Sequence, residues 1–139
     1  DDFFRRYKTI SYMKNYLAKN KKGYLETLVT NRYGKVIEGT VANVLCIKNG
    51  ILYYTGKNEN YLRGIMQCRI LNEYKSFGLK QIVEMDTGFT HDFLTDTEEI
   101  VLTNRLMIAK SVSKLVYGNE ISLFSSRKYS KIIRDYYLK

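Results

Sequence analysis

The chain has 139 residues, the usual size of one domain, and 45% of them are hydrophobic, which excludes an intrinsically disordered chain. The net charge of +9 would suit a nucleic acid, but equally a polyanionic small substrate or a phosphate-bearing cofactor. Because the basic residues are scattered and no zinc-finger or RNP-like motif is present, we expect no nucleic-acid partner.

Hydrophobic periodicity and turn residues predict, for the first half of the chain, a helix over 10–20 followed by strands over 24–30, 35–37, 44–48 and 51–54. A helix over 64–77, a strand over 79–85, a turn or short helix at 90–94 and a strand over 100–103 are predicted next. The last predicted elements are a hairpin of 111–116 with 121–124 and a helix over 125–138. Asn49-Gly50 suits the positive φ angles of a type I′ hairpin turn. Gly78 is placed to end the second helix, and Ser125 or Ser126 to cap the last. The pattern predicts one α+β, or mixed α/β, domain with helices packed on a sheet.

The cysteine and histidine counts limit the possible chemistry. His91 is the only histidine, which excludes a metal cluster or a catalytic triad built on histidines. Cys46 and Cys68 stand among apolar residues and are expected to be buried free thiols in a reducing cytoplasm. We also expect no membrane partner, since no apolar run could span a bilayer and no signal-peptide core is visible. The chain begins with Asp, which indicates processing or a longer parent protein.

Two charged residues stand at positions where they could carry chemistry. Lys8 lies between an aromatic residue and an apolar turn ahead of the first predicted helix. A lysine amine can form an imine when its surroundings lower its pKa, although a surface lysine is the ordinary interpretation. Glu38 ends a β-branched strand and is followed by Gly39, which would let the backbone approach a ligand closely. The ordinary alternative is an exposed Glu in a turn.

Two loops complete the set of candidate places. Residues 61–66 (YLRGIM) form a loop that enters a helix through Gly64, and the free amides of a helix start favour an anion such as phosphate. Residues 102–107 (LTNRLM) leave a buried strand and could give a second phosphate contact or a pocket wall. An ordinary helix start and an ordinary strand end are the competing interpretations.

The order and spacing of these four places resemble the fold-type IV, or class IV, pyridoxal-phosphate enzymes. This family includes branched-chain and D-amino-acid aminotransferases and aminodeoxychorismate lyases. The resemblance runs from about residue 7 to the C-terminus and rests on YKTI at 7–10, EGTVAN at 38–43, IKNGILY at 47–53 and LRGIM at 62–66. It implies that 1–139 form only the C-terminal cofactor-binding domain, a sheet or barrel-like core with packed helices, and that the N-terminal domain of the family is missing.

The resemblance also implies a role for particular residues toward pyridoxal 5′-phosphate. Lys8 would form the Schiff base with the cofactor and act as the catalytic base and acid, with Lys14 as a less well matched competitor. Glu38 would pair with the ring nitrogen, the amides of Ile65 and Met66 would hold the phosphate, and Asn104 would contact the cofactor.

The fourth motif is the best available guide to the reaction. Residues 103–107 (TNRLM) are similar to the aminodeoxychorismate lyase pattern, although Ser111 replaces its usual proline. The resemblance then implies conversion of 4-amino-4-deoxychorismate to 4-aminobenzoate and pyruvate, a step toward folate. A class IV aminotransferase acting on branched-chain or D-amino acids is the alternative, and a basic interaction domain without cofactor is a second. The full-length enzyme is expected to be a homodimer acting on a small molecule, and the isolated chain is not expected to be active.

Overall fold

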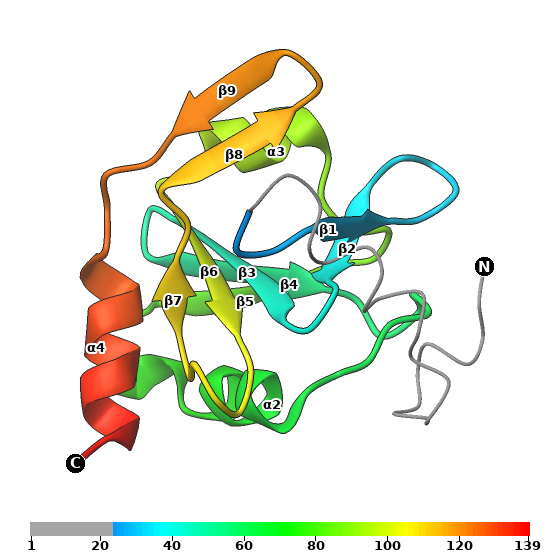
Figure 1. Ribbon diagram of the computed structural model, residues 1–139. Helices are drawn as coiled ribbons and strands as arrows, with labels where there is room; N and C mark the ends of the chain where they lie inside the picture. The colour runs from blue at the N-terminus through cyan, green and yellow to red at the C-terminus, as the bar shows by residue number, and fades with distance from the viewer. Residues whose placement is uncertain (1–23) are drawn as a thin grey trace.

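A five-stranded sheet forms the centre of the protein, which is described here over residues 24–139 of a computed structural model (Figure 1). Its strands lie in the order β5-β4-β3-β6-β7, with β5 at Gln81–Met85, β4 at Ile51–Thr55, β3 at Asn43–Lys48, β6 at Glu99–Thr103 and β7 at Lys110–Ser111. Two smaller sheets pair β1 (Leu28–Thr30) with β2 (Val36–Gly39) and β8 (Lys114–Tyr117) with β9 (Glu120–Leu123). The helices are α2 (Ile65–Asn72), the 3-10 helix η3 (Tyr74–Phe77), α3 (His91–Asp96) and α4 (Lys128–Tyr137). The α+β prediction is confirmed, whereas the helix predicted over 10–20 lies outside the described residues.

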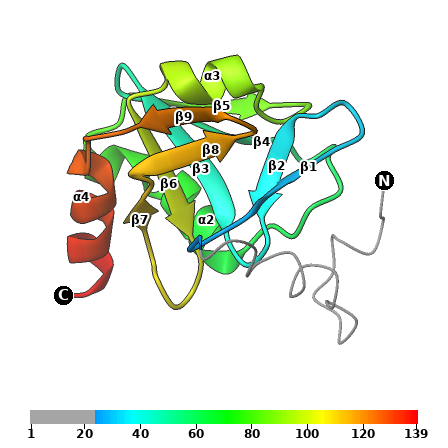
Figure 2. The same ribbon diagram turned by 45° about the horizontal axis from the view of Figure 1, so that its top comes forward.

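The central strands are buried on both faces, because each face of the sheet is covered by a separate hydrophobic core. Side chains alternate between the faces of a strand, so Leu45 and Ile47 of β3 enter one core while Val44 and Cys46 enter the other. The helices α2, η3 and α4 cover the first face. The β1–β2 and β8–β9 hairpins and α3 cover the second, as Figure 2 shows from above. Burial on both faces explains why β3 reads as a continuous apolar run.

The connections around β4 agree with the sequence prediction. β3 and β4 form an antiparallel hairpin, and its turn residues Asn49 and Gly50 have φ angles of 53° and 74°. Both angles are positive, as the Asn-Gly signal predicts. β5 pairs with β4 in parallel, so the chain must cross over between them, and α2 with η3 forms that crossover.

The second predicted helix is shorter than its apolar pattern suggested. An α-helix occupies Ile65–Asn72, and the chain then tightens into η3 before Gly78 ends it in the left-handed conformation, with φ 78°. The prediction that Gly78 stops the helix is confirmed. Ile65, at the first position of α2, is 74% exposed and so lies outside the apolar side of the helix.

The hairpin predicted for 111–116 and 121–124 begins later in the structure than its sequence pattern indicated. Residues 111–116 were expected to form one strand, but Ser111 ends β7, which pairs with β6, and the hairpin strand β8 begins only at Lys114. The first predicted strand, 24–30, is likewise reduced to Leu28–Thr30. Within 24–139, none of the helices is both long enough and apolar enough to cross a membrane.

The start of the last helix is capped by a distant side chain. The expected caps were Ser125 or Ser126, but the N-cap of α4 is Arg127, and its side chain makes no capping hydrogen bond. Glu99 of β6, which is fully buried, accepts hydrogen bonds from the amides of Tyr129 (3.0 Å) and Ser130 (2.9 Å) and from the Ser126 hydroxyl (3.2 Å). A carboxylate at a helix N-terminus satisfies its free amides and suits its dipole. In this protein the carboxylate comes from Glu99 on the central sheet.

The two cysteines should differ sharply in reactivity. Both are free thiols, but Cys46 is buried in the sheet whereas Cys68 is half-buried on α2. Burial raises the pKa of the Cys46 thiol far above its ordinary range, so the reactive thiolate is suppressed. We expect a thiol reagent such as DTNB to modify one thiol in the folded protein and the second only on unfolding. Cys68→Ser should remove the fast reaction, and a fast reaction that persists in this variant would contradict the assignment.

Candidate functional site

Glu38 is a buried carboxylate that faces the loop leading into α2. It lies on β2, its residue is 2% exposed, and its Oε2 accepts a hydrogen bond from the Leu62 amide at 3.3 Å. The alternative of an exposed turn carboxylate is therefore wrong. Burial of a carboxylate is costly unless hydrogen bonds or positive charge offset the lost hydration. The strand thus holds an acidic group against the 61–64 loop.

Asn43 joins the same loop to the start of β3. Its Nδ2 donates to the Leu62 carbonyl (2.7 Å), and its Oδ1 accepts from the Gly64 amide (2.9 Å). A Cβ on Gly64 would lie 2.6 Å from that Oδ1, so a larger residue would displace the amide. Asn43 was present in the 38–43 motif but carried no role in the sequence prediction. Its partners are about twenty residues away, so no local pattern could reveal them.

The first turn of α2 has the features of an anion site. Its N-cap is Gly64, no side chain caps it, and its first turn holds no acidic residue. The first helical hydrogen bond runs from the Cys68 amide to the Gly64 carbonyl (3.1 Å), so the amides of Ile65 and Met66 come before any intrahelical partner. Unpaired amides at the positive end of a helix dipole favour phosphate. The local structure therefore fits the role predicted for these two residues.

The turn after Glu38 is held by a second carboxylate. Glu26 accepts hydrogen bonds from the amides of Thr40 (3.0 Å) and Val41 (3.1 Å) and from the Thr40 hydroxyl. A Cβ on Gly39 would lie 2.9 Å from the Glu26 carboxyl group. Gly39 was predicted to let a ligand approach the backbone closely. In the structure the group that approaches is Glu26, which fixes the turn on which the Glu38 strand ends.

Asn104 organises the loop beyond β6. Its Oδ1 accepts from the amides of Leu106 (2.9 Å) and Met107 (2.8 Å), and its Nδ2 donates to the Val41 carbonyl (3.1 Å). These bonds form an Asx-type turn and attach the 104–107 loop to the turn after Glu38. The side chain thereby positions this loop, and its predicted direct contact with the cofactor stays a prediction.

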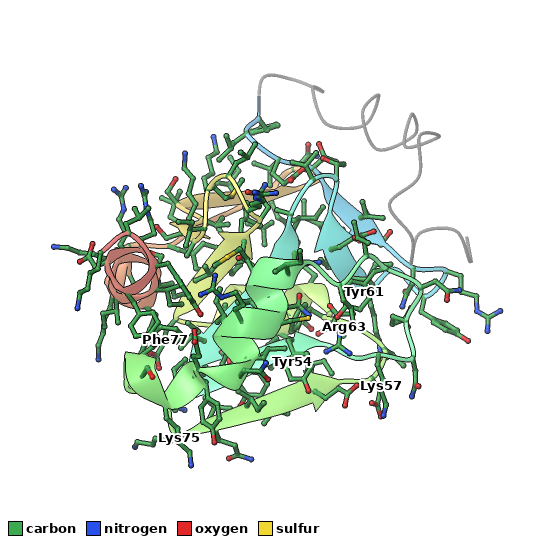
Figure 3. The ribbon with its side chains drawn as sticks, turned by 90° about the horizontal axis from the view of Figure 1, so that it is seen from below. Tyr54, Lys57, Tyr61, Arg63, Lys75 and Phe77 are labelled. Atoms are coloured by element: carbon green, nitrogen blue, oxygen red, sulfur yellow. The ribbon has the colours of Figure 1, made fainter. Side chains whose placement is uncertain are left out.

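The structure brings three of the four predicted places together. Glu38 contacts the 61–64 loop, that loop begins α2, and Asn104 holds its own loop against Val41 beside Glu38. Figure 3 shows Tyr61 and Arg63 of the 61–64 loop next to α2. Lys8 lies outside the described residues. The described groups fit pyridoxal phosphate, because a buried carboxylate for a protonated ring nitrogen and helix amides for a phosphate stand on joined loops.

A groove among the described residues lies away from Glu38 and the start of α2. It has a volume of about 560 Å³ and runs between β1, α3 and the β8–β9 hairpin, with Leu28, Leu94 and Leu115 among its walls. None of the predicted site residues Glu38, Ile65, Met66 and Asn104 lines it. The groove adjoins the second core, and Glu26, which holds the turn after Glu38, also lines it.

Tyr61 should make the stability of the protein depend on alkaline pH. Burial raises the pKa of Tyr61 to about 12, against smaller lowering effects of its Gln67 hydrogen bond and the Arg63 charge. The unfolded phenol titrates near 10, so the stabilisation is complete below about pH 10 and is lost as the pH rises toward 12. In urea unfolding, we expect Tyr61→Phe to show a shallower loss of stability over this interval. Identical slopes for the two proteins would contradict the assignment.

The family model and the curated relatives that match this chain point to the same protein family. The family model described as Amino-transferase class IV matches residues 1–115. A Synechocystis protein named "Probable branched-chain-amino-acid aminotransferase" is 25% identical over 118 residues, which cover 83% of this chain and 36% of that protein. The chain spans about a third of the length of the curated relatives it matches.

Solved structures share the fold. A 4-amino-4-deoxychorismate lyase from Pseudomonas aeruginosa superposes with a TM-score of 0.77 at 18% identity, covering 96% of this chain and 48% of that one. The branched-chain amino acid aminotransferase from Escherichia coli has a TM-score of 0.77 at 20% identity and covers 91% and 43%. Another branched-chain amino acid aminotransferase of this fold was solved with N-(5′-phosphopyridoxyl)-L-glutamate. The likeness extends over nearly all of this chain and about half of each solved structure.

Proposed function

We propose that this chain, which belongs to the class IV aminotransferase family of pyridoxal-phosphate enzymes, holds the cofactor between Lys8, Glu38 and the first turn of α2. Glu38 would hold the proton on the ring nitrogen, and the amides of Ile65 and Met66 would bind the phosphate. Asn104 would keep the neighbouring loop in place. The observation that carries this proposal is the buried Glu38 carboxylate bonded to the loop that opens an uncapped helix.

The proposed role of each residue follows from the chemistry of its side chain or amide. Bound pyridoxal phosphate supplies an electron sink for negative charge that develops on the substrate carbon. Glu38 favours that role because a carboxylate next to the ring nitrogen stabilises its protonated form. Lys8 would remove a proton from the substrate carbon and deliver one later, as a positioned general base and acid. Helix amides bind the phosphate without a charged side chain, so the cofactor stays anchored while Lys8 moves protons.

For the reaction, we favour lyase chemistry, in which 4-amino-4-deoxychorismate gives 4-aminobenzoate and pyruvate, a step toward folate. The support is the TNRLM sequence at 103–107, while the likeness in fold to the P. aeruginosa lyase and to the E. coli aminotransferase is equal and favours neither reaction. Asn104 is the second residue of that motif, and its three hydrogen bonds define the loop shape. Transamination is the second candidate, favoured by the curated relatives named as branched-chain-amino-acid aminotransferases.

One assay separates the two reactions. The full-length protein, loaded with pyridoxal phosphate, is given 4-amino-4-deoxychorismate, and pyruvate is measured with lactate dehydrogenase. In parallel, transfer of the amino group from branched-chain amino acids to 2-oxoglutarate is followed. Pyruvate release without amino transfer supports the lyase. Amino transfer without pyruvate release would overturn our first choice and favour the aminotransferase.

A simpler measurement tests cofactor binding itself. The loaded protein should show the visible absorbance of lysine-bound pyridoxal phosphate, and Lys8→Ala should remove it while Lys14→Ala retains it. Absorbance that survives in Lys8→Ala would refute the assignment of that lysine. A wild-type protein without this absorbance would instead favour the non-enzymatic interaction domain.

The complete enzyme requires more than the described domain. Because the chain spans about half of the solved structures it matches, the substrate pocket is proposed to include residues from beyond this chain. We propose that the full-length protein acts on its small-molecule substrate as a cytoplasmic homodimer. Sedimentation of the full-length protein would test this, and a monomeric active enzyme would refute it.

A further inference from the structure

Glu38 lies on a strand that stands outside the five-stranded sheet. Among residues 24–139, β2 pairs in register only with β1 in the two-stranded sheet, so the position of Glu38 depends on the contacts that attach β2 to the rest of the domain. At one end, Val36 exchanges two backbone hydrogen bonds with Phe89, each of 2.8 Å. One residue further along, the carbonyl of Ile37, directly before Glu38, accepts a hydrogen bond from the Thr55 hydroxyl at 2.8 Å.

A buried chain of hydrogen bonds continues from Thr55 to α2. The Thr55 carbonyl accepts a hydrogen bond from the Tyr61 hydroxyl (2.6 Å), and the Tyr61 oxygen accepts one from Gln67 Nε2 (2.9 Å). Thr55, Tyr61 and Gln67 are each at most 2% exposed. Gln67 is the third residue of α2, next to the amides that would bind phosphate. This series of hydrogen bonds therefore runs from the start of α2 to Ile37, the residue before Glu38.

The donor and acceptor groups fix the direction of every hydrogen bond in this buried series. A carbonyl can only accept, so the Tyr61 hydroxyl must donate to Thr55 and is free to accept only from Gln67. The Gln67 amide must then present its nitrogen to Tyr61. Its Oε1 has no hydrogen-bond partner within the described part of the chain, which carries a cost for a buried amide. The arrangement retains a donor to Tyr61 at the expense of an unpaired oxygen.

We propose that Tyr61 and Gln67 are positioning residues, which set the placement of the Glu38 strand relative to the phosphate-binding end of α2 through the buried chain Gln67–Tyr61–Thr55–Ile37. This inference rests on the proposed function and extends it. The cofactor would be held at two ends, by Glu38 and by the helix amides, and the chain fixes the separation of these ends. Neither Tyr61 nor Gln67 needs to touch the cofactor to act in this way.

The test uses Tyr61→Phe, which removes only the hydroxyl, in the full-length protein. Pyridoxal-phosphate affinity is measured by fluorescence titration, and the pH dependence of the bound cofactor's absorbance is recorded. We expect the Kd to rise about 3- to 10-fold, the effect of one net hydrogen bond. The pH midpoint for loss of the ring-nitrogen proton should fall, because a less closely held Glu38 stabilises the protonated ring less.

Two further variants separate positioning from stability. Tyr137→Phe is the matched control, since it also removes a tyrosine hydroxyl bonded inside the protein, to Glu73, but on α4. It should lower the melting temperature and leave the cofactor Kd and pH midpoint unchanged. Gln67→Met retains the side-chain length without the donor, so it should reproduce the effect of Tyr61→Phe and serves if that variant does not fold.

The outcomes distinguish the inference from the proposed function. If the wild-type protein does not bind pyridoxal phosphate, the proposed function fails and this inference fails with it. If the wild-type protein binds and a folded Tyr61→Phe or Gln67→Met variant keeps the same Kd and pH midpoint, the positioning role alone is refuted.

Discussion

Glu38→Gln is expected to lower the turnover of the loaded enzyme by about 10²- to 10³-fold, the range seen when one preorganised electrostatic group is removed. The amide is nearly the same size and still accepts a hydrogen bond from the Leu62 amide, so the strand and loop should stay in place. The lost feature is the negative charge that holds a proton on the ring nitrogen. The measurement is kcat with saturating cofactor, together with the cofactor absorbance between pH 5 and 9.

A second buried carboxylate provides the control for this substitution. Glu99→Gln changes a residue that is as buried as Glu38 but serves α4 instead of the candidate site. It should reduce stability and leave the cofactor absorbance unchanged. If Glu38→Gln retains full turnover and the wild-type pH dependence, Glu38 is not the partner of the ring nitrogen, and the proposed orientation of the cofactor is wrong.

Local patterns in the sequence were sufficient wherever neighbouring residues determine the structure. The β3–β4 hairpin depends on the positive φ angles of Asn49 and Gly50, and the end of η3 depends on Gly78. The two-sided burial of β3 follows from an uninterrupted apolar run. The contact between Glu38 and the loop before Gly64 agrees with the order of the motifs in the sequence. Both motifs stand next to strands or helices that the hydrophobic pattern located.

Contacts between distant residues were beyond a local pattern. The partner of Gly39 is Glu26, thirteen positions away, and the cap of α4 is Glu99, about thirty positions before the helix. The extent of α2 was overestimated for a related reason. Its periodicity continues through Tyr74, but the packing of η3 on the first core favours a tighter turn than an α-helix. Tertiary packing decided each of these features.

The described site is held mainly by side chains that bind loops. Glu26 fixes the turn after Glu38, Asn43 fixes the loop before α2, and Asn104 fixes its own loop. Each makes at least two hydrogen bonds to backbone groups, so each determines a loop conformation. Asn or Glu at such a position differs from a surface polar residue because its loss leaves backbone groups unpaired. These three polar side chains therefore set the loop conformations around Glu38.

Glu99→Ala should have the largest effect on stability, a loss of about 2–4 kcal/mol in the free energy of unfolding. The substitution leaves the buried amides of Tyr129 and Ser130 without their acceptor and opens a small cavity beside β6. Each unsatisfied buried group costs about 1–3 kcal/mol, and part of that cost is recovered if water enters. The free energy is measured by urea unfolding followed by far-UV circular dichroism, at constant pH and salt.

The neighbouring Glu98→Ala is the matched control for Glu99→Ala. Glu98 is exposed and accepts a single hydrogen bond from the Asn49 amide at 2.8 Å, so its loss should cost less than about 1 kcal/mol. Glu99→Gln should fall between the two, because one amide oxygen can still accept a hydrogen bond from the helix start. If Glu99→Ala is no less stable than Glu98→Ala, the carboxylate does not anchor α4. In that case the apolar contacts of α4, those of Tyr129 and Ile133 among them, attach the helix to the rest of the domain.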